Sequence, residues 1–202
     1  MYRKGGSIYK EYDTEQMLSP KRVVAERVSQ INSFDYSRFK ALAETKISIR
    51  NDILVYKQEF LIENRPSLDA LGLYELADAL EYLECLGFVH GDINRKNIVH
   101  TTRGYKVIDF EPDLYQRKNK IKQWMVTIPY IAKSDIERKR VTTLTDKIGF
   151  AYFILRLTGR FKSKDIVALS RSFNHEYYLG ADEAQLRKLS YKDLLKRYFG
   201  TT

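Results

Sequence analysis

The chain has 202 residues, of which 44% are hydrophobic and 30% are charged, a balance that supports a folded core and excludes a disordered or fibrous chain. The net charge of +9 predicts attraction to an acidic partner. The longest apolar stretch, 148–157, is interrupted by Arg156 and is too short to span a bilayer, and the first six residues lack an apolar signal segment. We therefore expect a cytoplasmic protein without a membrane span; delivery into a host cell as an effector stays open.

Residues 1–62 predict a small β-rich lobe with one helix. Ser19 and Pro20 mark the start of that helix, with Ser19 as the N-cap and Pro20 at the first helical position. The predicted elements are, in chain order, a very short strand turning at Gly5-Gly6, a strand at 7–12, a helix from 20 to about 31, and a hairpin of strands 46–50 and 53–61 turning at Asn51-Asp52.

Residues 63–202 predict a larger, mainly helical lobe. A helix from Leu71 to Leu86 has apolar residues at helical spacing and ends at Gly87. Cys85, the single cysteine, lies on the apolar side of this helix, so we expect a buried structural thiol. The other predicted elements are two short paired strands at 98–99 and 107–108 turning at Arg103-Gly104, a basic irregular segment after Asp109 through Lys122, and helices at 145–157 and 194–199.

One constellation of polar residues carries a specific chemistry. His90-x-Asp92-x-x-x-x-Asn97 precedes the first of the short paired strands, and 109–111 (Asp-Phe-Glu) follows the second. Phosphoryl transfer needs one carboxylate to meet the substrate hydroxyl, and an amide and a second carboxylate to hold Mg²⁺. The spacing therefore predicts a phosphoryl-transfer centre in which the strands fix Asn97 relative to Asp109.

These motifs resemble the catalytic loop and the metal-binding Asp-Phe-Gly motif of the eukaryotic-like protein kinase superfamily. Residues 126–134 are similar to that family's Gly-Thr-Pro-Glu-Tyr-x-Ala-Pro-Glu segment, and 145–159 to its central helix, so the resemblance covers most of 71–159. It implies an α+β, bilobal protein-kinase-like fold with a truncated β-rich N-lobe at 1–62 and a mainly helical C-lobe, holding the catalytic loop and activation segment, at 63–202. The implied protein is a minimal kinase of bacterial or viral type that uses ATP and Mg²⁺ to phosphorylate Ser or Thr of a protein substrate.

The resemblance also implies roles for the residues of the centre. Asp92 orients the attacking hydroxyl and accepts its proton late, while Asn97 and Asp109 hold Mg²⁺ across the phosphates. Lys96 is either a second catalytic residue that reaches the γ-phosphate or an ordinary surface lysine. Asp146 is implied to anchor the backbone of the catalytic loop, and His90 is expected to be a packed, hydrogen-bonded side chain of that loop.

Four residues are implied on the nucleotide side. Lys10, on the strand at 7–12, clamps the nucleotide phosphates. Glu26 is the only glutamate inside the first helix, and is either the partner of Lys10 or a solvated residue, because it lies away from the apolar side of the helix. Backbone groups near Glu59 and Leu61 bind the adenine edge.

Three departures from the family pattern affect these expectations. The chain has no room before Lys10 for the glycine-rich loop that covers the ATP phosphates, Gly91 replaces the arginine beside the catalytic aspartate (a non-RD pattern), and Glu111 replaces the glycine of Asp-Phe-Gly. The missing loop leaves open a pseudokinase, which binds a regulatory partner without catalysis. A kinase for a small alcohol is a further alternative, although the basic segments disfavour the cationic substrates that such enzymes usually take.

Basic residues concentrate in 117–122 and 138–140. They are either solvated surface or a docking patch for an acidic protein, a phosphate-rich ligand or RNA. We expect a protein substrate with an acidic surface, recruited by Arg117, Lys118, Lys120 and Lys122; a nucleic acid is the less favoured partner. The trimmed N-lobe also leaves room for a regulatory partner at the nucleotide site.

Overall fold

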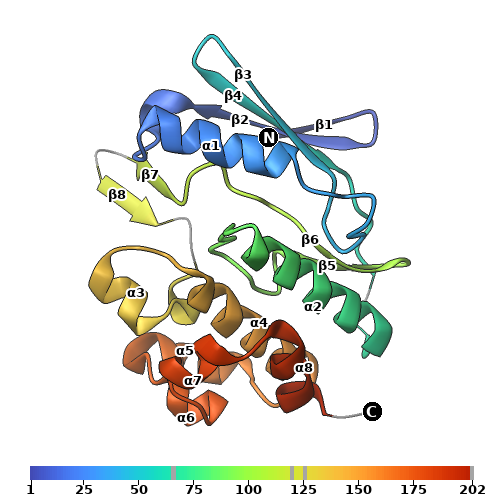
Figure 1. Ribbon diagram of the computed structural model, residues 1–202, viewed down its shortest axis with the longest axis vertical. Helices are drawn as coiled ribbons and strands as arrows, with labels where there is room; N and C mark the ends of the chain where they lie inside the picture. The colour runs from blue at the N-terminus through green and yellow to red at the C-terminus, as the bar shows by residue number, and fades with distance from the viewer. Residues whose placement is uncertain (65–66, 119–120, 125–126, 201–202) are drawn as a thin grey trace.

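The computed structural model describes residues 1–64, 67–118, 121–124 and 127–200 as an α+β chain (Figure 1). A four-stranded antiparallel sheet with helix α1 (Lys21–Asn32) lies at one end, and a group of helices lies at the other. Helix α2 (Ala70–Cys85) and a small β-ribbon lie between them. The arrangement is compatible with two lobes, and the buried apolar residues of both ends form one continuous cluster.

The sheet has the strand order β1-β2-β4-β3. Its strands are β1 (Tyr2–Lys4), β2 (Ser7–Asp13), β3 (Thr45–Arg50) and β4 (Ile53–Glu59). Gly5 and Gly6 form the first turn, and Asn51 and Asp52 form the β3–β4 turn, all four with positive φ as tight hairpins require. The predicted strands and turns of this region are therefore confirmed.

Helix α1 packs on the sheet through Val24, Val28 and Ile31. Its predicted extent is correct within one or two residues, but Ser19 is not its N-cap. The Ser19 hydroxyl donates to the Asp113 carboxylate at 2.7 Å, and the backbone N–H of Ser19 donates to the same carboxylate at 2.9 Å. Pro20, predicted as the first helical residue, itself occupies the N-cap position, and it makes no side-chain capping hydrogen bond.

Helix α2 begins after Asp69, whose carboxylate accepts from the Gly72 N–H at 3.0 Å, and ends before Gly87 at φ 67°. The prediction of a helix here is confirmed, but the prediction that Cys85 is buried is wrong, because the thiol is exposed. The buried stripe of the helix runs through Leu73, Leu76, Leu80 and Leu83. Cys85 lies two residues after Leu83, about 200° around the helix, and so faces away from this stripe.

Strands β5 (Ile98–Thr101) and β6 (Gly104–Val107) pair as predicted. Val107 also exchanges backbone hydrogen bonds with Ala41 and Ala43, of 2.7 and 2.9 Å, so the segment between α1 and β3 is bound to the ribbon. This contact links the sheet end of the molecule to the ribbon that carries the candidate site.

The segment expected to be irregular contains a second ribbon, β7 (Tyr115–Lys118) paired with β8 (Ile121–Trp124). Each strand has four residues and is rich in Arg, Lys and Gln, so the apolar alternation that predicts a strand is missing. Of the basic docking candidates, Arg117, Lys118 and Lys122 belong to this ribbon, and Lys120 lies outside the described residues.

The helical end is built around α4 (Thr143–Leu157), which is buried along most of its length and packs against α7 and α8. The helices that surround it are α3 (Lys133–Arg138), α5 (Ser163–Ser172), α6 (His175–Leu179), α7 (Glu183–Lys188) and α8 (Tyr191–Phe199). Within the described ranges, no helix combines the length and the apolar character needed to cross a membrane.

Candidate active site

Asp92 is the centre of a hydrogen-bond cluster formed by the loop before β5. Its Oδ1 accepts from the Asn94 amide at 2.7 Å and from the Thr127 backbone N–H at 2.8 Å, and its Oδ2 accepts from the Asn97 amide at 2.7 Å. Both asparagines also donate to the Asp92 backbone carbonyl, at 3.1 and 2.9 Å. Hydrogen bonds to both carboxylate oxygens fix the direction of the Asp92 side chain.

The backbone of this loop is held from helix α4. The Asp146 carboxylate accepts from the N–H groups of His90 and Gly91, both at 2.7 Å, so the predicted anchoring role is confirmed. Burial raises the pKa of Asp146 to about 7. The prediction for His90 is also confirmed, since the ring is buried, Nε2 donates to the Ile108 carbonyl at 2.9 Å, and burial lowers its pKa.

Two glycines allow the loop to lie where it does. Gly91 has φ +86°, and a Cβ at this position would lie 2.6 Å from a methyl group of Leu114. Gly149 on α4 has its Cα against the loop, and a Cβ there would lie 2.1 Å from the Ile93 carbonyl oxygen. The absence of a side chain at Gly149 therefore sets how closely the loop that carries Asp92 approaches α4.

Asn97 and Asp109 lie at the same end of the β5–β6 ribbon, where β5 begins and β6 ends. The Ile108 N–H donates to the Asn97 carbonyl at 2.9 Å, so the prediction that the ribbon fixes the two residues relative to each other is confirmed. Asp109 itself has φ 67°, in the left-handed region. This backbone conformation turns the chain at Asp109, just after the end of β6.

Lys10, on strand β2 of the sheet, contacts Asp109, which follows strand β6 of the ribbon. The Lys10 ammonium forms an ion pair with Asp109 Oδ1 and lies 3.8 Å from Glu111 Oε1. It also lies 5.5 Å from the centre of the buried Tyr56 ring, which faces it from the paired position on β4. The structure thus brings the predicted strand lysine to the predicted metal-binding carboxylate, although 99 positions separate them in the sequence.

Glu26 is not part of this cluster. It is exposed and forms an i,i+4 ion pair with Arg22 at 3.1 Å, so of the two alternatives the solvated glutamate is correct. The Glu26 side chain points to solvent because the opposite face of α1 packs against the sheet.

A second carboxylate near Lys10, besides that of Asp109, belongs to Glu111, to which the sequence analysis assigned no place in the site. Glu111 is 8% exposed, and its pKa is raised to about 7, first by burial and then by the neighbouring Asp109 charge. The signal available in the sequence was the replacement of the Asp-Phe-Gly glycine.

Arg27 of α1 contacts the same motif. Its Nε donates to the Glu111 carbonyl at 2.5 Å, and its guanidinium lies 4.1 Å from the Phe88 ring centre.

The predicted adenine-binding positions, Glu59 and Leu61, lie at the end of β4. The Glu59 N–H donates to the Glu44 carbonyl at 2.9 Å, and its carboxylate pairs with Lys106 at 2.5 Å. The Leu61 N–H has no hydrogen-bond partner among the described residues. Leu61 is therefore the better candidate for a ligand contact, and the adenine role of both residues stays a prediction.

Lys96 is exposed, and within the described part of the chain it makes no ion pair. Asn94, which contacts the Asp92 carboxylate alongside Asn97 and Thr127, was not predicted from the sequence. Asn94 also accepts the Lys96 N–H at 2.7 Å, so it organises the loop from inside. A polar residue two positions after Asp92 was the signal that could have identified it.

The side-chain oxygens of Asn97 and Asp109 are ligands that suit a hard cation. Asn97 donates through its amide nitrogen to Asp92, which leaves its side-chain oxygen to serve as a metal ligand. The described residues hold no group of three or more His, Cys, Asp or Glu side chains able to bind a metal by themselves. An amide and a carboxylate fit Mg²⁺, which proteins often hold with one or two carboxylates while phosphates and water complete the shell.

Comparisons of the chain with models of known protein families and with curated protein sequences find no match. The function must therefore be inferred from the geometry of the site.

Proposed function

We propose that the chain is a minimal protein kinase that transfers the γ-phosphate of ATP, with Mg²⁺, to Ser or Thr hydroxyls of a protein substrate. The observation that carries the proposal is the Asp92 carboxylate, held by Asn94, Asn97 and Thr127 at 2.7 to 2.8 Å. A carboxylate with fixed direction, next to a metal-binding amide, is the arrangement that this transfer requires.

In this proposal the protein contributes positioning and charge. Asp92 accepts a hydrogen bond from the substrate hydroxyl, aligns it and takes up its proton late in the transfer. Asn97 and Asp109 would hold the cation, and Lys10 would bind the phosphates. Bound ATP would supply the phosphoryl group, and Mg²⁺ would neutralise part of the charge that develops on it.

The ion pair between Lys10 and Asp109 bears on how the nucleotide would bind. Both side chains are partly exposed, at 22% and 26%, so solvent reaches the pair. An ion pair of this exposure contributes little to stability. Exchange of the Asp109 carboxylate on Lys10 for a phosphate oxygen is therefore energetically accessible and would release Asp109 for the cation.

The arrangement of the chain supports the same proposal. The sheet carries the lysine on β2, the ribbon carries the amide and the second carboxylate, and α4 anchors the loop through Asp146. A kinase-like, two-lobe fold with a reduced small lobe at 1–62 accounts for these three placements together.

A pseudokinase is the second candidate, and the same Lys10–Asp109 contact favours it. While the Lys10 ammonium is paired with it, the Asp109 carboxylate is occupied and does not offer itself to a cation. In that case the chain would bind its partner without transferring phosphate.

Incubation of the purified chain with γ-labelled ATP, Mg²⁺ and a cell lysate, followed by mass spectrometry, tests the proposal. Phosphorylated Ser or Thr should form with wild-type protein and be lost with Asp92→Ala, which must melt at the wild-type temperature to serve as a control. Transfer by Asp92→Ala at the wild-type rate would overturn the proposal. Binding of Mg²⁺–ATP in a thermal-shift assay without any transfer would favour the pseudokinase.

A further inference from the structure

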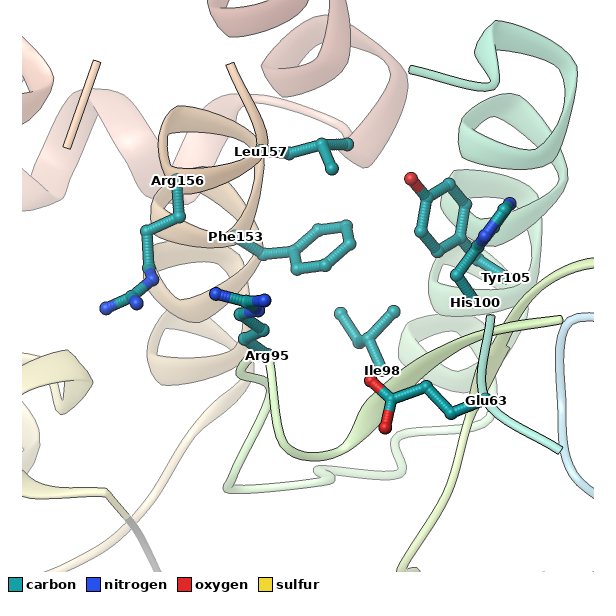
Figure 2. A pocket seen from close by; sticks show the side chains of 8 residues that line it. All are labelled: Glu63, Arg95, Ile98, His100, Tyr105, Phe153, Arg156 and Leu157. Atoms are coloured by element: carbon teal, nitrogen blue, oxygen red, sulfur yellow. The ribbon is translucent and has the colours of Figure 1, made fainter. Parts of the chain in front are cut away.

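A groove with cationic and apolar walls runs along α4 beside the candidate active site. It consists of two adjoining cavities of about 240 and 630 Å³, which share Glu63, Arg95 and Arg156. Figure 2 shows the smaller cavity, where Phe153 and Leu157 of α4 face the β5–β6 ribbon and the guanidinium groups of Arg95 and Arg156 lie on the same side of the Phe153 ring. We call this feature the α4 groove.

The charges of the α4 groove are not balanced. Arg95, Lys96 and Arg156 contribute three cations, and Glu63 contributes the one carboxylate among the lining residues. Within the described part of the chain, neither arginine forms an ion pair.

Arg156 supplies a second and independent observation. Its Nε is buried and has no hydrogen-bond partner among the described residues. A buried donor on a charged group costs free energy when it is left unsatisfied. The geometry therefore points to an anionic ligand that accepts from this guanidinium.

The larger cavity reaches the catalytic loop. Asn94 and Thr127 line it, and both donate to the Asp92 carboxylate, at 2.7 and 2.8 Å. A chain bound in the α4 groove would thus pass directly beside the group that orients a substrate hydroxyl.

We propose that the α4 groove binds an acidic segment of the protein substrate, with carboxylates on Arg95 and Arg156 and an apolar side chain against Phe153. This inference rests on the proposed function, since it names the substrate that Asp92 would receive. The apolar wall formed by Ile98, Phe153 and Leu157 favours a peptide over a nucleic acid, because apolar side chains of a peptide gain from burial there and a sugar–phosphate backbone does not.

Direct binding tests the proposal without relying on catalysis. The probe is a fluorescent peptide with a single serine flanked by glutamate and leucine, and its control carries glutamine in place of glutamate. Wild-type protein should bind the glutamate peptide more tightly, and Arg95→Gln or Arg156→Gln should each weaken binding about tenfold, which corresponds to one charge-assisted hydrogen bond. Arg171→Gln, on the exposed surface of α5, is the matched control and should leave binding unchanged.

Charge reversal separates recognition from damage to the fold. Arg95→Glu, at an exposed position, should lose the glutamate peptide and gain a peptide in which lysine replaces glutamate. Equal affinity of the wild type for the glutamate and glutamine peptides would overturn the proposal. Tighter binding of single-stranded RNA than of the glutamate peptide, lost in the same two arginine variants, would also overturn it.

The outcomes distinguish this inference from the proposed function. Charge-dependent binding without phosphate transfer would leave the α4 groove as a docking site and refute the kinase. Phosphorylation of the glutamate and glutamine peptides at equal rates and equal Michaelis constants would support the proposed kinase function and refute recognition of acidic residues in the α4 groove.

Discussion

Arg27 donates through Nε to the backbone carbonyl of Glu111 at 2.5 Å and thereby ties helix α1 to the Asp-Phe-Glu motif. The sequence led us to consider whether α1 would offer a carboxylate to Lys10. The helix offers a cation instead, and the carboxylate at 3.8 Å from Lys10 comes from Glu111. The expected contact of α1 with Lys10 is therefore absent, and α1 instead contacts the Asp-Phe-Glu motif through Arg27.

We expect Arg27→Met to destabilise the fold by about 2 kcal/mol, since it removes a charged hydrogen bond whose acceptor stays buried. The Arg27 guanidinium is buried, and burial lowers its pKa to about 10. Arg22→Met on the same helix removes an exposed ion pair and should change stability by less than about 0.5 kcal/mol. Urea unfolding measures both, and similar losses in the two variants would contradict the role of Arg27.

The buried carboxyl of Glu111 should make stability depend on pH. Its pKa rises from its usual 4.5 to about 7 in the folded protein, so between these values the folded state holds a proton that the unfolded state has released. Stability contributed by this group is therefore present below pH 4.5 and is lost as the pH rises through 7, by on the order of 3 kcal/mol.

Glu111→Gln removes this titration and is the natural comparison. The difference in unfolding free energy, wild type minus variant, should fall between about pH 4.5 and 7. The pKa of Asp146 is raised in the same direction, but it is present in both proteins and cancels in the subtraction. A difference that is constant with pH would mean that Glu111 is ionised in the folded protein.

Substitutions of Asn94 and Lys96 should have different effects on kcat and the Michaelis constant. Asn94→Ala removes a donor at 2.7 Å from Asp92 and should lower kcat roughly a hundredfold, as expected when a positioning group is lost. Lys96→Ala should keep kcat and raise only the Michaelis constant of acidic substrates, because this side chain is exposed and lines the α4 groove. A kcat loss in Lys96→Ala as large as that in Asn94→Ala would restore Lys96 as a catalytic residue.

Gly149→Ala tests the contact between α4 and the loop that carries Asp92. Helix propensity alone predicts that alanine stabilises an interior helical position by about 1 kcal/mol. Because the new Cβ would lie 2.1 Å from the Ile93 carbonyl oxygen, we expect instead a destabilisation of roughly 1–3 kcal/mol and a loss of activity. A melting temperature at or above that of the wild type would show that the loop can move away without cost.

Gly91 leads to a prediction about regulation. In kinases with arginine beside the catalytic aspartate, a phosphate on the following segment pairs with that arginine. Gly91 offers no side chain for such a pair, so phosphatase-treated protein should be fully active when assayed alone. Activity that arises only after phosphorylation between Glu111 and Thr127 would contradict this expectation.

The sequence by itself determined most of the helices and strands and the polar centre of the site. Asp92, Asn97 and Asp109 could be identified because a short loop and a two-stranded ribbon place them, and both depend on residues close together in the chain. The helices at 71–86 and 145–157 were predictable for the same reason, since apolar periodicity is a local property.

Only the tertiary structure decided which side chains meet across the fold. Lys10 reaches Asp109, Arg27 reaches Glu111, and Thr127 reaches Asp92, and each contact depends on how the sheet, the ribbon and the helices pack. The exposure of Cys85 and the cations gathered along α4 depend on the same packing. Spacing along the chain sets the local direction of a side chain, whereas the burial of apolar faces between elements sets its distant neighbours.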